Sequence, residues 1–196
     1  MLRNMTFENF DPKRADLEPE QRNNLGRVYK MAKSFADEPE GWLVLQGTNG
    51  CGKTHLAAAI GNYQLKRAKP VIFIVVPDFL DHLRSTYNTD GRLGPDVLFD
   101  RVKNAALLIL DDFGEQAITP WAQEKLYQLI NYRYNDMLPT VITTCLSLEE
   151  IEIRIRSRLI DGKVGTVFGI TVPDYRGDHT DAEMVRTQSQ RAKKTR

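Results

Sequence analysis

One stretch of the chain combines glycines, a lysine and a hydroxyl side chain at a spacing that suits a phosphate chain. Its sequence is G-T-N-G-C-G-K-T, formed by Gly47, Thr48, Asn49, Gly50, Cys51, Gly52, Lys53 and Thr54. Glycines let the backbone curl so that successive N–H groups point at one anion. The lysine supplies a cation for the phosphates, and the hydroxyl after it supplies a ligand for Mg²⁺. The stretch therefore predicts a phosphate-binding loop that takes ATP.

The residues on either side of this loop fit that interpretation. Residues 41–46 are mostly apolar, which predicts a buried strand, and residues 55–65 are rich in Ala and Leu, which predicts a helix. A helix that begins at the loop directs its first N–H groups at the same anion. His55 stands at the start of this helix, and we expect it close to the nucleotide. Because strand, loop and helix occur in the required order, a chance glycine-rich turn is the weaker alternative.

A second apolar run ends in two adjacent carboxylates. Residues 105–110 predict a buried strand, and Asp111 and Asp112 follow it directly. Ligands of parallel α/β sheets bind at the carboxyl ends of the strands, so we expect both side chains beside the phosphates. Asp111 is then a ligand of Mg²⁺, directly or through water, and Asp112 orients and deprotonates the attacking water. The alternative is a carboxylate pair that only caps a helix.

The composition is that of an ordinary globular protein. With 196 residues, of which 41% are hydrophobic and 27% charged, the chain is expected to form one domain with a sizeable core. A net charge of +1 gives no general attraction to nucleic acid, so DNA binding requires a local basic patch.

Two cysteines are too few for a disulfide framework or a zinc site. With no apolar signal sequence and no apolar run near the roughly 18 residues of a membrane span, we expect a cytoplasmic protein without a membrane partner.

The pattern along the rest of the chain predicts alternating strands and helices around this core. Residues 1–39 are expected to form an N-terminal arm and an amphipathic helix, residues 40–177 the main domain, and residues 178–196 a basic, disordered tail. Phe7 and Phe10 in the arm are expected to dock it on the body or on a partner. Further strands are predicted at 71–76, 139–144 and 167–172, and helices at 20–35, 79–84, 97–102, 120–135 and 148–159.

Together these motifs resemble the AAA+ ATPases of the DnaC/DnaI/IstB group, which comprises bacterial replicative helicase loaders and transposition helper ATPases. The resemblance extends from about residue 6 to residue 177, and its specific parts are residues 7–10, 47–54, 107–114, 157–159 and 175–176. It implies an α/β P-loop fold, a three-layer sandwich around a central, mainly parallel sheet of five strands. Only about 50 residues follow the strand at 139–144, so the helical lid of many AAA+ proteins is expected to be reduced or absent.

The resemblance also implies roles for residues further along the chain. Arg158 matches the arginine finger, which reaches the γ-phosphate of a neighbouring subunit and stabilises charge on the phosphoryl oxygens. Arg176 matches the second sensor arginine, which contacts nucleotide in its own subunit. Cys145 stands where the group commonly has a polar Asn, and Thr144 is expected to substitute because a thiol is a weak hydrogen-bond donor. This departure implies slow hydrolysis with intact nucleotide binding.

The implied function is that of an ATPase that uses Mg²⁺, oligomerises on DNA, expected to be single-stranded, and loads or regulates a replicative helicase. One alternative is a transposition helper ATPase that acts on a transposase, and another is a nucleotide-responsive scaffold with negligible turnover. A small-molecule kinase is less well supported, because no Arg-rich lid lies between the predicted strands. The cations considered for DNA contact are Lys66, Arg67, Lys69, Arg84 and Arg92.

Overall fold

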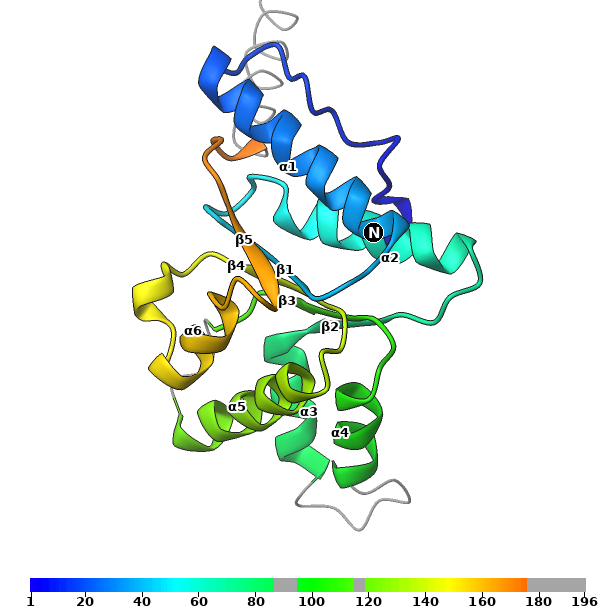
Figure 1. Ribbon diagram of the computed structural model, residues 1–196, viewed down its shortest axis with the longest axis vertical. Helices are drawn as coiled ribbons and strands as arrows, with labels where there is room; N and C mark the ends of the chain where they lie inside the picture. Colours follow the sequence, from blue (N-terminus) through cyan, green and yellow to red (C-terminus); the bar gives the residue numbers. More distant parts are fainter. Residues whose placement is uncertain (87–94, 115–118, 176–196) are drawn as a thin grey trace, which may run out of the picture.

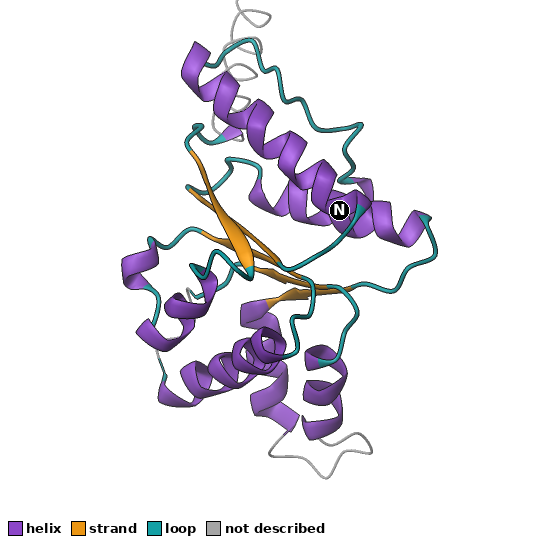
Figure 2. Ribbon diagram, in the orientation of Figure 1, coloured by secondary structure: helices purple, strands orange, loops and turns teal. Residues whose placement is uncertain are grey.

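The computed structural model describes residues 1–86, 95–114 and 119–175 of the chain. These residues form a single five-stranded sheet between two layers of helices (Figures 1 and 2). All strand pairs are parallel, and their order is β2-β3-β4-β1-β5. The strands are β1 Trp42–Gly47, β2 Ile72–Val75, β3 Leu108–Asp111, β4 Thr140–Thr144 and β5 Gly165–Ile170. The predicted three-layer α/β fold with a parallel five-stranded sheet is confirmed.

The helices divide between the two faces of the sheet (Figure 2). One face is covered by α1 Pro19–Asp37 and α2 Lys53–Lys66. The other face is covered by α3 Val76–Thr86, α4 Pro95–Lys103, α5 Pro120–Asn135 and α6 Ile153–Leu159. Two short 3₁₀ helices are η1 Leu2–Asn4 and η2 Leu148–Glu150. None of the helices in the described ranges is both long enough and apolar enough to cross a membrane.

The side chains of each strand point alternately to the two faces of the sheet, and each face carries a hydrophobic core. Successive side chains of a strand point to opposite faces. In β1, Leu43 and Leu45 pack in the cluster with α1 and α2, whereas Val44 packs in the cluster with α3 to α6. Burial on both faces explains why β1 and β3 are largely continuous apolar runs in the sequence.

Two predicted elements differ in their limits from the structure. The helix predicted at 148–159 is interrupted, because Ile151 adopts an extended backbone that lets its side chain reach the core, and Glu152 then caps α6 by accepting from the N–H of Ile155. The strand predicted at 71–76 ends at Val75, and α3 begins at Val76. A proline in the first turn of a helix is tolerated because its missing N–H would have no partner there, so Pro77 lies inside α3 instead of ending the strand.

After β5 the chain continues to Tyr175, the last described residue, and no helical lid lies in this segment. The tail predicted for 178–196 lies outside the described residues.

The N-terminal arm docks on the body of the chain: Phe7 is buried, and its ring is edge-on to Tyr29 of α1 and Tyr63 of α2. Phe10 also packs against this cluster. Both aromatic side chains of the arm therefore contact the layer of α1 and α2, which also contains the predicted phosphate loop.

Candidate nucleotide-binding site

β1 leads directly into the predicted phosphate loop, which ends at the first residue of α2. Gly50 and Gly52 have φ values of 72° and 104°, in the left-handed region that glycine adopts at little cost. Gly52 is the N-cap of α2, and having no side chain it cannot cap the helix with a side-chain hydrogen bond. The first N–H groups of a helix have no intrahelical partner, so those of α2 are available to an anion in the loop.

Lys53 is directed into the loop. Its side chain is only 5% exposed, and its Nζ donates hydrogen bonds of 2.8 Å to the carbonyl oxygens of Gly47 and of Thr48. Both acceptors are neutral carbonyls, so phosphate oxygens that replaced them would add the attraction between opposite charges. The ammonium group therefore lies at the loop, where phosphate oxygens could replace the two carbonyl oxygens as its hydrogen-bond acceptors.

The loop helix and the acid pair meet at Asp111. Thr54 Oγ1 donates to Asp111 Oδ1 at 3.0 Å, and Thr143 Oγ1 donates to the same oxygen at 2.6 Å. Burial raises the pKa of the Asp111 carboxyl, the hydrogen bonds from Thr143 and Thr54 lower it, and the charge of Asp112 raises it further. Hydroxyl and carboxylate oxygens are the hard ligands that Mg²⁺ prefers, so this pair fits the predicted metal.

Asp112 occupies an unusual backbone conformation. Its φ is 55°, in the left-handed region, which costs a residue with a Cβ about 1–2 kcal/mol, although Asp and Asn tolerate it best. Its N–H donates to Thr143 Oγ1 at 3.1 Å. The Thr143 hydroxyl thus donates to the side chain of one acid and accepts from the main chain of the next.

The end of β4 lies between β1 and β3, and it brings Thr143 to the acid pair. Thr144, which was expected to substitute for the polar sensor, donates its hydroxyl to the carbonyl of Phe113 at 2.8 Å and accepts from the N–H of Leu146 at 3.1 Å. Thr143 was missed. Strand alternation was the available signal, because Val141 packs with α2 and a residue two positions later faces the same side.

The segment that follows β5 crosses the outside of the loop. Thr48 Oγ1 donates to the carbonyl of Val172 at 3.4 Å, and the N–H of Tyr175 donates to the carbonyl of Gly50 at 3.1 Å. A Cβ on Gly50 would lie 1.6 Å from Asp174 Oδ1, so this carboxylate packs directly against the loop glycine. The predicted second sensor, Arg176, is the next residue after Tyr175 and lies outside the described residues.

The N-terminal arm covers the start of α2. The Phe10 ring is edge-on to His55 with a centroid separation of 5.2 Å, and a Cβ on Gly52 would lie 2.9 Å from it. His55 Nε2 lies 2.9 Å from the carbonyl oxygen of Thr6. His55 therefore lies directly after the loop with its ring engaged by the arm, and its predicted proximity to the nucleotide stays a prediction.

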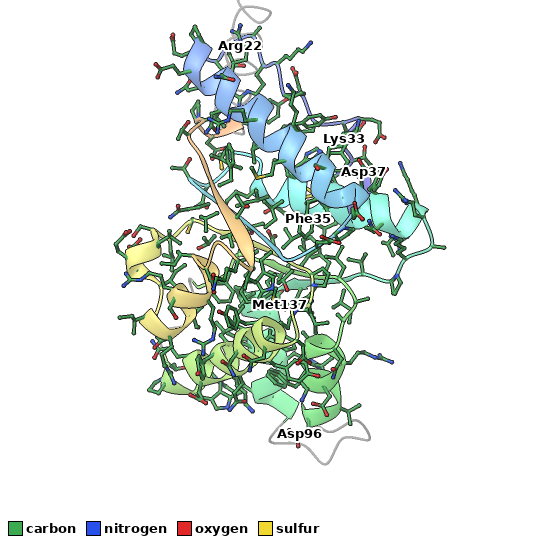
Figure 3. All side chains as sticks on the ribbon, viewed as in Figure 1. Arg22, Lys33, Phe35, Asp37, Asp96 and Met137 are labelled. Carbon is green, nitrogen blue, oxygen red and sulfur yellow. The ribbon has the colours of Figure 1, made fainter. Side chains whose placement is uncertain are left out.

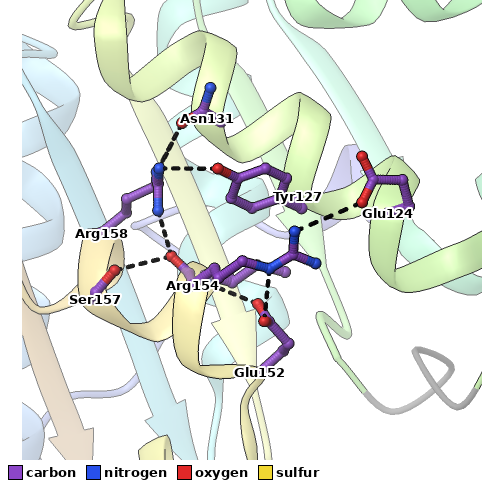
Figure 4. Close-up of polar contacts among 8 residues, drawn as sticks. Glu124, Tyr127, Asn131, Glu152, Arg154, Ser157 and Arg158 are labelled. Atoms are coloured by element: carbon purple, nitrogen blue, oxygen red, sulfur yellow. Dashed lines mark hydrogen bonds and ion pairs between the residues drawn. The ribbon is translucent and has the colours of Figure 1, made fainter. Parts of the chain in front are cut away.

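Arg158, the predicted arginine finger, is held on α6 by side chains of α5 (Figure 4). Its Nε and Nη2 donate to Asn131 Oδ1 at 3.0 and 2.6 Å, and Nη2 also donates to the hydroxyl of Tyr127 at 3.2 Å. Its Nη1 donates to the carbonyl of Arg154 at 2.6 Å. None of these partners belongs to the phosphate loop or to the acid pair, and the predicted role of Arg158 at a neighbouring subunit stays a prediction.

The strand order, the phosphate loop and the acid pair together define an α/β protein of the AAA+ class that binds nucleoside triphosphates. The model of the family described as IstB-like ATP binding protein matches residues 3–160, and the chain belongs to this family. The prediction of a DnaC/DnaI/IstB-like AAA+ protein is thereby confirmed.

Relatives and solved structures agree with this assignment. The chain is 30% identical over 158 residues to the replicative helicase loader DnaC of Escherichia coli strain K12, a match that spans 81% of this chain and 62% of DnaC. It is 35% identical over 146 residues to the uncharacterized protein YdaV of the same strain, over 72% of this chain and 58% of YdaV. The chain therefore covers less than two thirds of either relative.

Two crystal structures show the same fold. The DnaC helicase loader superposes with a TM-score of 0.71 at 23% identity and covers 85% of this chain and 97% of that one. Domain III of the replication initiation protein DnaA from Thermotoga maritima superposes with a TM-score of 0.70 at 26% identity, over 87% of this chain and 68% of that one.

Proposed function

We propose that this chain binds and hydrolyses ATP, assembles on single-stranded DNA and loads or regulates a replicative helicase. The observation that carries the proposal is the hydrogen bond between Thr54 and Asp111, which joins the phosphate loop to the acid pair at one edge of the sheet. The similarity to a replicative helicase loader supports the choice of partner. The IstB-like family model supports a transposition helper ATPase, acting on a transposase, as the alternative.

Each residue of the site has a role in this proposal. The loop N–H groups and Lys53 bind the phosphates, and Thr54 and Asp111 would hold Mg²⁺, which when bound neutralises charge on the phosphate oxygens. Asp112 orients the attacking water and accepts its proton. Thr143 is a positioning residue, since its hydroxyl contacts both acids. Arg158 from a neighbouring subunit and Arg176 from the same subunit stabilise the transferring phosphoryl group.

One observation favours a second candidate, a nucleotide-responsive scaffold with negligible turnover. The Thr144 hydroxyl is engaged by two backbone groups, and the following residue is Cys145, whose thiol is a weak donor. If no side chain at this position holds the attacking water, nucleotide is bound but hydrolysed slowly.

Phosphate release measured with and without single-stranded DNA separates the two candidates. We expect Asp112→Asn to lower the rate of release by about a hundredfold or more, because it removes the general base. The same variant should bind ATP with an affinity within about twofold of the parent, because Asn is isosteric and tolerates positive φ. A parent protein that releases phosphate no faster than Asp112→Asn would contradict hydrolysis and leave the scaffold.

A further inference from the structure

A basic groove of about 540 Å³ lies between the N-terminal arm and α1. We infer that this groove, defined by Lys13, Arg22, Gly26, Arg27 and Lys30, binds the sugar–phosphate backbone of single-stranded DNA. The inference rests on the proposed function and names where its nucleic acid binds. None of these residues is among the cations for which DNA contact was predicted from the sequence.

The groove is positively charged. Four cations line it, and no Asp or Glu is among the lining residues. Because the whole chain carries a net charge of only +1, such a group is a local cluster of cationic side chains. In the described part of the chain, the side chains of Lys13 and Lys30 make no ion pair or hydrogen bond that would neutralise them.

Arg22 keeps the groove in shape. Its guanidinium donates to the carbonyl oxygens of Arg14, Ala15 and Leu17, at 3.2, 3.3 and 2.8 Å, and so fixes the arm against the first turns of α1. It lies near the amino-terminal end of the helix (Figure 3). These acceptors are neutral, so the positive charge of Arg22 remains uncompensated by them.

Gly26 leaves an open space in the groove that packing does not require. A glycine inside a helix costs about 1 kcal/mol relative to alanine, yet a Cβ on Gly26 would meet no atom within 4 Å. The packing of the protein therefore does not require glycine here. Arg22, Gly26 and Lys30 are four residues apart and lie on one side of the helix, over about 12 Å of its length. The missing side chain leaves the floor of the groove open between two cations.

The chemistry of the lining favours a phosphate backbone over a peptide. Amphipathic helical peptides that dock in grooves rely on apolar anchor side chains in apolar pockets. No Leu, Ile, Val, Met or Phe lines this groove, whose uncharged surface consists of two prolines, an asparagine, Gly26 and the ring of Tyr29. Cations that follow the backbone, with flat surfaces beside them, are typical of sites for single-stranded nucleic acid.

The test is fluorescence anisotropy with a labelled oligo-dT and the full chain with ATP analogue. We expect the double variant Arg27→Glu, Lys30→Glu to bind at least about tenfold more weakly, and the slope of log K against log salt to fall by about 1.4, for two lost phosphate contacts. Gly26→Gln, which fills the floor without changing charge and favours the helix, is expected to weaken binding about fivefold or more.

The matched control is Arg101→Glu, Lys163→Glu, which makes the same charge change at exposed positions outside the groove and should weaken binding less than about threefold. Equal losses for the groove and control variants, or no loss for the groove variants, would overturn the inference alone. Failure of the parent to bind oligo-dT while it still binds nucleotide would overturn both the inference and the DNA part of the proposed function. Tighter binding of polyglutamate than of oligo-dT in the groove would show that DNA is the wrong occupant.

Discussion

The carboxylate of Asp174 lies where it repels an anion that enters the phosphate loop. It packs against Gly50, and its charge reaches the interior of the loop: burial raises the pKa of the Cys51 thiol, Lys53 lowers it, and Asp174 raises it again. The negative charge of Asp174, in the segment after β5, therefore opposes the attraction of Lys53 for an anion in the loop.

This arrangement predicts that Asp174→Asn binds ATP about threefold to tenfold more tightly than the parent at low salt, with the gain shrinking as salt screens the charge. Titration of a fluorescent ATP analogue measures it. Asp96→Asn, the same change at an exposed position on α4, far from the loop (Figure 3), is the control and should leave the affinity unchanged. Equal affinity of the Asp174 variant and the parent would show that the segment moves aside without cost.

Single residues also show where sequence interpretation succeeds and where it ends. The loop residues and Asp111 were predictable because their types and spacing are dictated by phosphate and metal chemistry. Asp174 was not, because its contact with Gly50 depends on how the end of β5 crosses the loop. Arg133 resembles a surface cation in the sequence, yet it is fully buried, and its guanidinium donates to the carbonyls of Lys103, Ala105 and Pro139.

At the scale of elements, the end of β3 carries a buried carboxyl group whose ionisation opposes folding. The pKa of Asp111 is raised in the folded protein, so the folded state holds its proton to a higher pH than the unfolded chain does. Its contribution to stability is therefore fully present below the ordinary carboxyl pKa and is lost as pH rises through the raised value.

Asp111→Asn removes this titration. We expect the variant and the parent to have similar melting temperatures at low pH, and the variant to be the more stable at neutral pH in the absence of nucleotide and Mg²⁺. Melting temperature measured across the pH range checks this sign. A parent whose advantage over Asp111→Asn grows as pH rises would contradict the assigned direction of the pKa shift.

Element types were predictable from apolar runs, and their limits were less so. Apolar runs marked β1 to β4 correctly within a few residues, and the edge strand β5 begins two residues before its predicted range. The interruption of the helix predicted at 148–159 depends on Ile151 reaching a core formed by distant segments. Helical periodicity cannot detect such a tertiary requirement.

At the scale of the whole molecule, Arg158 connects the site to self-association. Among the described residues its contacts are with α5 and α6, whereas the proposed role requires it to reach nucleotide bound to a neighbour (Figure 4). Assembly must therefore exchange the Asn131 and Tyr127 contacts for a phosphate.

We expect Arg158→Ala to bind ATP analogue as the parent does but to lose the nucleotide-dependent increase in mass measured by light scattering with DNA present. Arg156→Ala, on the same helix, is the matched control and should assemble normally. If both variants, or neither, lost the increase in mass, Arg158 would not be the group that senses nucleotide across the subunit boundary.

The central claim is that the loop between β1 and α2 binds ATP through its backbone and Lys53. Equilibrium titration of a fluorescent ATP analogue with Mg²⁺ tests it most directly, on the parent, on Lys53→Ala and on Lys53→Met, which retains the buried stem. The account predicts at least tenfold weaker binding for both variants, a loss of about 1.4 kcal/mol or more, with unchanged circular dichroism. Variants that bind the analogue as tightly as the parent would contradict it.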